Sequence, residues 1–423
     1  MGDISTSLVL ADKTNSSEQE NQCIRITSFM MEHEKQDESK KSSKLSHDLE
    51  VVDKQQNTGF HNPSVVMSDD SNSLISKLGR DISISCLLRL SRSEYGLIAS
   101  LNKSYRSLIR TGELYQIRQK MGIVEHWLYF SCDVQRWEAF DPNRRRWFDL
   151  PSIAFDQCFT CSDKESLAVG TELLVFGRGP WTQVIYSYSH LTNTWSDGTL
   201  MNIPRYLFGS ASLGGIAIVA GGCDKKGNIL SVAELYDSNT KKWEILPSMH
   251  RPRKICSGVF MDGKFYVLGG IGEDPKKLLT CGEEYDLRTR TWRVIPNMFP
   301  PQSREGAVAD KRDTAEAPPL VAVASNELYA ADYERWELRR YVKETNKWVT
   351  IGSLPEGSSS VNGWGLAFRA CGDQLFFLGG PNALSVTATD INSWVPGEDA
   401  PQWNVLARRQ SMGFVYNCAV MGC

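Results

Sequence analysis

The amino-acid sequence predicts a mainly β protein: a six-bladed β-propeller that follows a small helical segment and a disordered N-terminal tail. The main observation is a repeat, because six tryptophans recur at intervals of 48, 48, 49, 56 and 55 residues. Repeats of this length are typical of propellers and solenoids. A hairpin pattern before the tryptophans and glycine pairs upstream of them also favour a propeller. The repeated tryptophans are Trp147, Trp195, Trp243, Trp292, Trp348 and Trp403.

A two-stranded hairpin is predicted at each of the first five tryptophans. An aromatic residue stands seven positions before each of them, and a polar stretch such as DSNTKK or DLRTRT lies between. This spacing fits two antiparallel strands joined by a tight turn. The sixth repeat departs from the pattern, because Pro396 stands at the aromatic position. The five aromatic residues are Phe140, Tyr188, Tyr236, Tyr285 and Tyr341.

Short apolar strands that end in small residues precede these hairpins. IVAGG ends at Gly222, YVLGG at Gly270 and FFLGG at Gly380, while LVFGR and LYAAD are weaker copies. Glycine is suited to places where strands crowd and the backbone bends. A four-stranded blade cannot cover both of its faces, so blades stack around an axis and bury aromatic residues between them. The repeated tryptophans are therefore interpreted as structural.

The elements follow in chain order, beginning with a tail over residues 1–73. This segment is rich in Ser, Asn, Gln, Asp, Glu and Lys, and its apolar residues are sparse and without period. Such a chain buries too little apolar area to offset the entropy lost on ordering. We expect it to be disordered.

Residues 74–122 form the helical segment, and its first helix is predicted in LGRDISISCLLRL. Leu78, Ile82, Cys86 and Leu90 recur every four residues, with Leu87 beside them, as on one face of a helix. Asp81 or Ser83 is the expected N-cap.

A second amphipathic run follows, with apolar residues three or four apart from Tyr95 to Leu108. Gly112 then separates a last short helix, ELYQIRQKMG. Helices this short bury little against one another, so they need a partner protein or the neighbouring domain. Both interpretations, docking segment and brace for the propeller, are open at this point.

Residues 123–423 form the propeller, and its ends predict how the ring closes. WLYFSCDVQRWEAFDPNRRRWFDLP supplies three strands of the first blade, whereas the C-terminal GFVYNCAVMGC is a single apolar strand without a hairpin partner. Placing that strand innermost in the first blade joins the ends of the ring and leaves no open edge. This arrangement gives six blades.

Composition argues against several classes of function. A formal net charge of -3 and a pI near 6.1 give no basic footprint for nucleic acid. The sequence contains no apolar run of about 18 residues, so no membrane span is predicted. Eleven scattered cysteines suggest reduced thiols in the nucleus or cytoplasm. Cys158 and Cys161 form one C-x-x-C without the further ligands of a zinc site. We expect no metal, no cofactor and no catalytic chemistry, although a propeller enzyme is a less favoured alternative.

The repeat resembles the kelch motif: a Gly-Gly pair, then Tyr236-Asp237 or Tyr285-Asp286, then a tryptophan six residues after the aspartate. The helical segment before it resembles an F-box. Together they are similar to plant F-box/kelch-repeat proteins from about Leu74 to Cys423, including MNIPRYLFGSASLG and SVNGWGLAFRACG. Gly79 and Ser91 stand where F-boxes usually carry proline, at two helix boundaries.

This resemblance implies a substrate-recognition subunit of a cullin–RING ubiquitin ligase. The F-box would dock on a Skp-type adaptor, and the propeller would capture a protein target for ubiquitination. The alternative is a kelch scaffold without a ligase role. The positions that match the adaptor-facing residues of an F-box are Leu78, Ile82, Cys86, Leu87, Leu90 and Leu97.

For the target, the candidate surface is the face where chain segments enter and leave the inner strands. Arg205, Arg253, Arg304 and Arg409 each follow a repeated tryptophan and would place guanidinium groups around the channel. Guanidinium groups bind carboxylates and phosphates well, which suggests an acidic or phosphorylated target. The competing interpretation is internal pairing with Glu234 and Glu283. The insertion at 296–319 is long enough to be a binding loop or a disordered one.

Overall fold

In the computed structural model, the described residues are 74, 79–132, 136–153, 165–179, 183–274, 278–299, 317–356, 360, 362–380, 388–397, 399–411 and 414–423. The chain divides into two compact units, residues 1–121 and 122–423. The predicted tail, Leu78, the pair Cys158 and Cys161, and most of the 296–319 insertion lie outside the described residues.

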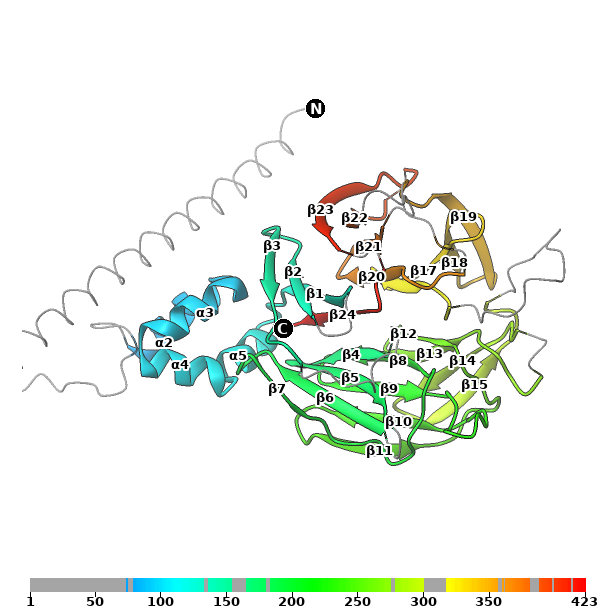
Figure 1. Cartoon of the computed structure of the whole chain (residues 1–423), viewed down its shortest axis with the longest axis horizontal. Coiled ribbons are helices and arrows are strands. Elements are labelled where there is room, and N and C mark those ends of the chain that lie inside the picture. Colours follow the sequence, from blue (N-terminus) through cyan, green and yellow to red (C-terminus); the bar gives the residue numbers. More distant parts are fainter. Residues whose placement is uncertain are drawn as a thin grey trace, which may run out of the picture. The chain divides into compact units, whose positions relative to one another are not determined.

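The described part of the first unit consists of short helices, shown in blue and cyan in Figure 1. Their apolar residues face one another, so Ile84, Leu87, Tyr95, Ile98 and Leu108 are all buried. The helices are α2 (Arg80–Leu88), α3 (Arg92–Leu101), α4 (Lys103–Arg110) and α5 (Glu113–Lys120).

Helix α2 begins before the two predicted capping residues, Asp81 and Ser83. Its N-cap is Gly79, so the prediction of Asp81 or Ser83 as the cap is wrong. Asp81 instead lies in the first turn, where a carboxylate interacts favourably with the positive end of the helix dipole. The buried side of α2 is formed by Ser83, Ile84, Leu87 and Leu88. This side differs from the predicted face, which included Ile82.

Asn102 divides the second amphipathic run into α3 and α4. Its backbone is extended, and its side-chain oxygen accepts a hydrogen bond of 2.9 Å from the Tyr105 backbone N–H. This is the geometry of an N-cap. Gly112 ends the run as predicted, because it adopts a left-handed backbone conformation (φ 78°) immediately before α5.

The second unit consists of six four-stranded antiparallel sheets, which are the blades of the predicted propeller. Blade 1 contains β24 (Asn417–Gly422), β1 (His126–Ser131), β2 (Glu138–Asp141) and β3 (Arg146–Asp149). Blade 2 contains β4 (Ser166–Val169), β5 (Glu172–Arg178), β6 (Gln183–Ser189) and β7 (Thr194–Asp197). Blade 3 contains β8 (Gly209–Leu213), β9 (Ile216–Ala220), β10 (Ala233–Asp237) and β11 (Lys242–Leu246).

Blades 4 to 6 have the same order. Blade 4 contains β12 (Ser257–Met261), β13 (Lys264–Leu268), β14 (Gly282–Asp286) and β15 (Thr291–Ile295). Blade 5 contains β16 (Val321–Ala324), β17 (Glu327–Asp332), β18 (Glu337–Val342) and β19 (Lys347–Ser353). Blade 6 contains β20 (Ala367–Cys371), β21 (Gln374–Gly379), β22 (Ala388–Trp394) and β23 (Asn404–Gln410).

The ring closes through β24, as the sequence predicts. This strand pairs with β1 from His126–Gly422 to Ser131–Asn417, and Figure 1 shows the red strand β24 beside β1. It also neighbours β4 and β20, the first strands of the blades on either side. Blade 1 is therefore built from two distant parts of the chain, and the ring has no open seam.

The glycine pairs allow close approach between neighbouring segments. Gly221 and Gly222 have φ values of 71° and 91°, which lie in the left-handed region. A Cβ atom on Gly221 would come within 2.3 Å of the Arg253 carbonyl oxygen, and one on Gly222 within 2.5 Å of the Tyr206 carbonyl oxygen. No other residue type fits both conditions without strain.

In blades 2 to 6 the repeated tryptophan connects the blade to the chain segment that leaves the preceding blade, because its indole N–H donates to a backbone carbonyl at 2.7–2.9 Å. In blades 1 to 5 its ring packs beside the hairpin aromatic residue. The structural interpretation is confirmed. The donor–acceptor pairs are Trp195–Pro151, Trp243–Thr199, Trp292–Pro247, Trp348–Met298 and Trp403–Ser353.

In blade 6 the missing aromatic residue is replaced by Trp394. Its ring lies 6.1 Å from that of Trp403, and it pairs across β21 with Leu375. Trp394 stands nine residues before Trp403 instead of seven, because the turn between β22 and β23 is longer. The fixed spacing used for the prediction could not find it.

Candidate interaction sites

Each blade runs back and forth, so its loops lie on two opposite edges of the ring. The connection edge carries the loops between the second and third strands of each blade and the connections between blades. The hairpin edge carries the remaining turns. Of the predicted target-binding arginines, Arg205 and Arg253 lie in the connections between blades, and the direction of their guanidinium groups decides whether they can reach a target.

Arg205 and Arg253 are both fully buried. Arg253 Nη2 lies 2.8 Å from Glu283 Oε1, and Arg205 forms a close ion pair with Glu234. Arg253 Nη1 also donates to the carbonyl oxygens of Gly269 (3.1 Å) and Cys281 (3.0 Å). These contacts hold each connection against the third strand of its own blade.

The carboxylates of these pairs also bind the backbone of the connections. Glu234 accepts hydrogen bonds from the backbone N–H groups of Asn202 (2.8 Å) and Ile203 (3.0 Å). Glu283 does the same for His250 (2.8 Å) and Arg251 (3.1 Å).

The prediction that Arg205 and Arg253 face a target is therefore wrong. Their donors are used inside the protein, and the competing interpretation, pairing with Glu234 and Glu283, is confirmed.

Arg409 occupies the matching position at the seam between blades 6 and 1. It lies on the outer strand β23, pairs with Glu138 at 2.5 Å, and stacks over the Trp147 ring at 5.2 Å. Glu138 stands two residues before Phe140, as Glu234 stands before Tyr236. Arg409 is thus also a seam contact, although its side chain is partly exposed. Arg304 lies outside the described residues, so its role stays a prediction.

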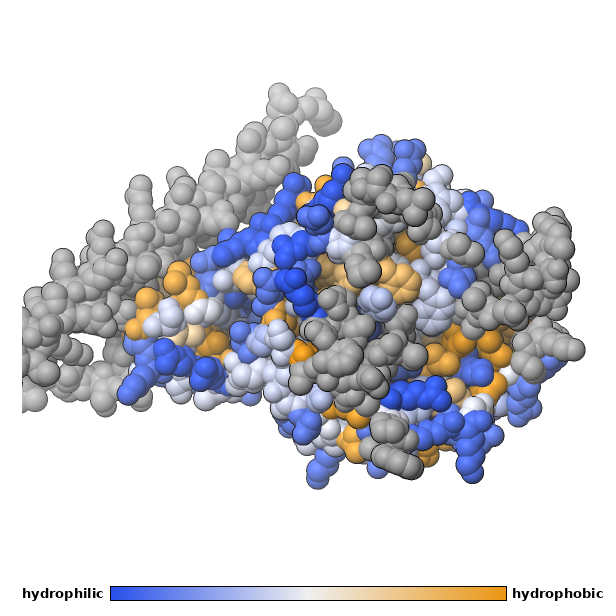
Figure 2. All heavy atoms as spheres, viewed as in Figure 1, coloured by the Kyte–Doolittle hydropathy of each residue, from blue (hydrophilic) through white to orange (hydrophobic). Residues whose placement is uncertain are grey.

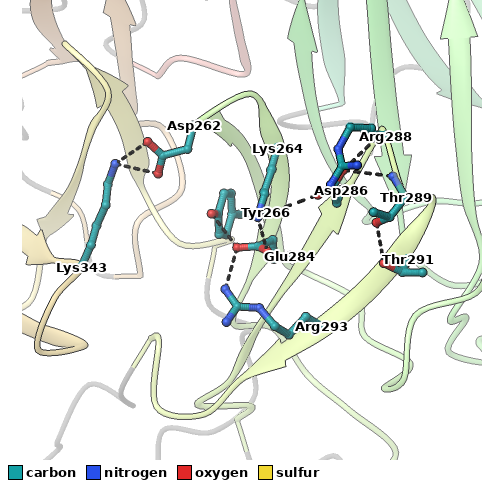
Figure 3. Close-up of polar contacts among 10 residues, drawn as sticks. All are labelled: Asp262, Lys264, Tyr266, Glu284, Asp286, Arg288, Thr289, Thr291, Arg293 and Lys343. Atoms are coloured by element: carbon teal, nitrogen blue, oxygen red, sulfur yellow. Dashed lines mark hydrogen bonds and ion pairs between the residues drawn. The ribbon is translucent and has the colours of Figure 1, made fainter.

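The hairpin edge near blade 4 carries a polar network, shown in Figure 3. Glu284 lies between Tyr266 and Arg293 on neighbouring strands and accepts from Lys264 (2.8 Å), Tyr266 (2.7 Å) and Arg293 (3.0 Å). Burial opposes ionisation of Glu284, but these hydrogen bonds outweigh it and hold the pKa of the carboxyl at about 2. Burial and the hydrogen bond to Glu284 raise the pKa of Tyr266.

Cations at the hairpin edge also connect neighbouring blades. Lys343 forms an ion pair with Asp262 at 2.7 Å, and Figure 3 draws the two side chains facing each other. Lys241 pairs with Glu172 and Arg290 with Glu244, each at 2.6 Å. Because these pairs cross from one blade to the next, their role is to join blades. They were not predicted, since the turn residues alone do not show which strand lies opposite.

In the helical unit, Arg118 organises the junction of α2 and α3. Its side chain is buried and donates to the carbonyl of Leu90 (3.1 Å) and to the hydroxyl of Tyr95 (3.1 Å). A cation at this place satisfies carbonyl groups that follow the end of α2. Arg80 and Glu113 connect α2 with α5 at 2.8 Å.

The residues predicted to contact an adaptor are divided by the structure. Ile82 is 56% exposed and Leu97 is 50% exposed. Cys86 and Leu90 are half-buried. Leu87 is only 2% exposed, and its carbonyl accepts from Tyr95, so it belongs to the helical core and its assignment to the contact surface is wrong. Figure 2 shows hydrophobic residues at the surface in the region that Figure 1 labels α2 and α3.

The sequence reasoning missed the positive charge of this unit. Residues 80–121 contain eight Lys and Arg residues but three Asp and Glu residues. Lys103, Arg106 and Arg110 are exposed on α4 at spacings of three and four, so they share one helix face. A local charge count would have found them.

Across the described residues, no group of three His, Cys, Asp or Glu side chains is placed to hold a metal ion. No helix in the described part of the chain is long and apolar enough to cross a membrane. Neither search suggests another site.

Comparison with known proteins adds a family to this geometry. The Kelch motif model matches residues 204–250 and 252–299, which span blades 3 and 4. The chain is 59% identical over 358 residues to F-box/kelch-repeat protein SKIP11 of Arabidopsis thaliana, covering 84% of this chain and 76% of that protein. It is 55% identical to F-box/kelch-repeat protein At1g74510 of the same plant, over 83% of this chain and 80% of that protein.

Proposed function

This chain belongs to the F-box/kelch-repeat family, and from that premise we propose that it is a substrate-recognition subunit of a cullin–RING ubiquitin ligase. The helical unit docks on a Skp-type adaptor, and the propeller captures a protein target. The chain itself transfers no ubiquitin. Its contribution is to hold the target near the ligase, which raises the effective concentration of target lysines.

The observation that supports adaptor docking is the pair of exposed apolar side chains on α2 and α3. Ile82 and Leu97 are each at least half exposed, although neighbouring residues of the same helices are buried. Exposed large apolar residues on a small helical unit indicate a surface that a partner covers. Burying a leucine or isoleucine side chain contributes about 1.5–3 kcal/mol, so two of them can dominate a small interface.

The propeller supplies the surface for the target. Its repeated tryptophans, glycine pairs and Arg–Glu pairs are all used to hold the ring together. Capture must therefore depend on side chains outside this repeated framework, on the loops that differ from blade to blade.

The test is a pull-down of a Skp-type adaptor by the intact chain and by an Ile82→Asp, Leu97→Asp double variant. Because both side chains are exposed, the variant should fold but lose binding at least about tenfold, which corresponds to about 1.4 kcal/mol. Circular dichroism checks that the variant is folded.

The matched control is Leu213→Asp, which introduces the same charge at an apolar residue of the propeller that is 45% exposed. It should bind the adaptor like the parent. If the intact chain binds no adaptor, the ligase role is wrong and a scaffold role takes its place.

A further inference from the structure

Five exposed or half-exposed cations lie on the connection edge of blades 2 to 4, and none pairs with a carboxylate among the described residues. We call them the basic loop patch. They come from three neighbouring chain segments: the end of β5, the loop between β9 and β10, and the connection from β11 to β12. The five residues are Arg178, Lys225, Lys226, Arg251 and Lys254.

Hydrogen bonds and ring contacts join these segments into one surface. The Arg178 guanidinium stacks over the Tyr206 ring at 5.1 Å. Tyr206 exchanges two backbone hydrogen bonds with Cys223, at 3.0 and 2.8 Å, which fixes the start of the loop that carries Lys225 and Lys226.

The third segment is attached to the same loop. The backbone N–H of Gly222 donates to the Arg253 carbonyl at 2.8 Å, immediately before Lys254. Burial raises the pKa of the Cys223 thiol, whereas the positive charges of Lys254 and Arg178 both lower this pKa. The two cations therefore converge on one place although they belong to different blades.

The carboxylates around this patch already have internal partners. Glu234 and Glu283 are buried against Arg205 and Arg253. Glu165 is buried and accepts from the backbone N–H of Leu207.

Asp224 is the carboxylate within the loop itself. Its Oδ1 accepts from the backbone N–H groups of Lys226 and Asn228, both at 2.9 Å, and its Oδ2 accepts from the Asn228 amide at 2.7 Å. Exposed Glu273 and Asp274 belong to the corresponding loop of blade 4. The five cations of the patch therefore outnumber the three carboxylates of these loops, Asp224, Glu273 and Asp274.

At the hairpin edge, Lys241, Arg290 and Lys343 pair with carboxylates of the preceding blade. These three cations contribute to joining blades, whereas the five cations of the basic loop patch make no ion pair within the described structure.

We propose that the basic loop patch binds an acidic segment, rich in Asp and Glu, of the protein target. This inference rests on the proposed function and names the chemistry of the target. Three of the five cations are lysines, which act as separate point charges and fit carboxylates spread along an extended chain. A phosphate group favours arginine forks, but the patch has only two arginines, and one of them, Arg178, stacks on the Tyr206 ring.

The experiment measures fluorescence anisotropy of a fluorescein-labelled peptide of alternating Glu and Gly with the intact chain. The triple variant Lys225→Glu, Lys226→Glu, Lys254→Glu should weaken binding by about tenfold or more, because it reverses charge on two of the three segments. Affinity for the parent should fall between about 50 and 300 mM NaCl, as expected for exposed charges.

The matched control is Lys242→Glu, Lys347→Glu, which reverses exposed charges of the hairpin edge. It should change affinity by less than about twofold, since each isolated surface charge contributes little. Equal losses in both variants, or no peptide binding by the parent, would overturn the proposal. So would a peptide with phosphoserine in place of Glu that binds more than about tenfold tighter.

Adaptor pull-down on the same triple variant separates this inference from the proposed function. Retained adaptor binding with lost peptide binding supports both. Adaptor binding by a parent that ignores the acidic peptide overturns only the inference. Peptide binding by a chain that binds no adaptor overturns only the ligase role.

Discussion

The buried Arg253–Glu283 ion pair stabilises a connection between blades. In the Arg253–Glu283 pair, each partner also forms hydrogen bonds with the backbone, which compensates for the cost of removing two charges from water. Leaving one partner alone in such a site costs about 3–5 kcal/mol. Charge reversal at Arg253 would therefore unfold the blade and says nothing about target capture.

Glu284 makes stability depend on pH in a defined direction. Its pKa is held at about 2, below the ordinary 4.5, so the folded state prefers the ionised carboxyl. The resulting stabilisation is fully present above pH 4.5 and is lost as pH falls through about 2. Glu284→Gln should be less stable than the parent at neutral pH, and the difference should shrink between these two values. Urea midpoints measured across the pH series test this.

Thr291→Ala serves as the control for this measurement. Thr291 lies on the adjacent strand β15 and does not titrate, so its substitution should shift every midpoint by a similar amount. A difference between parent and Glu284→Gln that stays constant from neutral pH to pH 2 would contradict the assigned role.

At the scale of the blade, the outer hairpin is the element that holds neighbours together. The hairpins of blades 2 to 6 each donate a tryptophan N–H to the segment leaving the preceding blade, and at the hairpin edge several turns add an ion pair to the same neighbour. The same hairpin motif therefore makes the same contact with the preceding blade at successive positions around the ring. Such near-neighbour contacts are the basis of stability in repeat proteins.

Replacing Trp292 by Phe should weaken the seam between blades 3 and 4. The substitution removes the 2.7 Å hydrogen bond to the Pro247 carbonyl and leaves that oxygen without its donor. We expect a loss of about 1–3 kcal/mol in the free energy of unfolding, measured by urea denaturation. Trp403→Phe is the control, because its equivalent bond is exposed and water can replace the donor. An equal loss in both variants would contradict the seam argument.

The sequence predicted the elements that repeat and missed those that depend on one pairing. The tryptophans and hairpins were found because the same spacing recurs five times. Arg205 and Leu87 were assigned to surfaces because a residue type alone does not show whether a carboxylate or a helix covers it. Ile82 illustrates the reverse case: the predicted contact residue is exposed, although the buried face of its helix was predicted wrongly.

At the scale of the whole chain, the two units expose different features. The propeller is closed by the pairing of β24 with β1, whereas α2 and α3 of the helical unit expose Ile82 and Leu97. Under the proposed function, the closed ring presents loops to a target and the exposed side chains of α2 and α3 accept an adaptor.

Removing residues 414–423 should destroy the propeller. The change deletes β24, exposes the edge of β1, and removes Val415, Cys418 and Met421, each at most 1% exposed, from the core. We expect a loss of at least about 5 kcal/mol, comparable with the total stability of a domain. Thermal unfolding and size-exclusion chromatography test this. A Gly-Ser extension after Cys423 adds no unpaired edge and should behave like the parent; a shortened chain that unfolds like the parent would contradict the role of β24.

The position of β24 at the end of the chain also determines when the propeller can close during synthesis. A ribosome adds about 5–20 residues per second, so β1 waits roughly 15–60 s for residues 417–422 to be made. Throughout that interval β1 has a bare edge, and a nascent chain with such an edge invites chaperones or aggregation. Any chain that stops early, even by ten residues, keeps that edge permanently. For this chain, translation has to be nearly complete before the propeller can close.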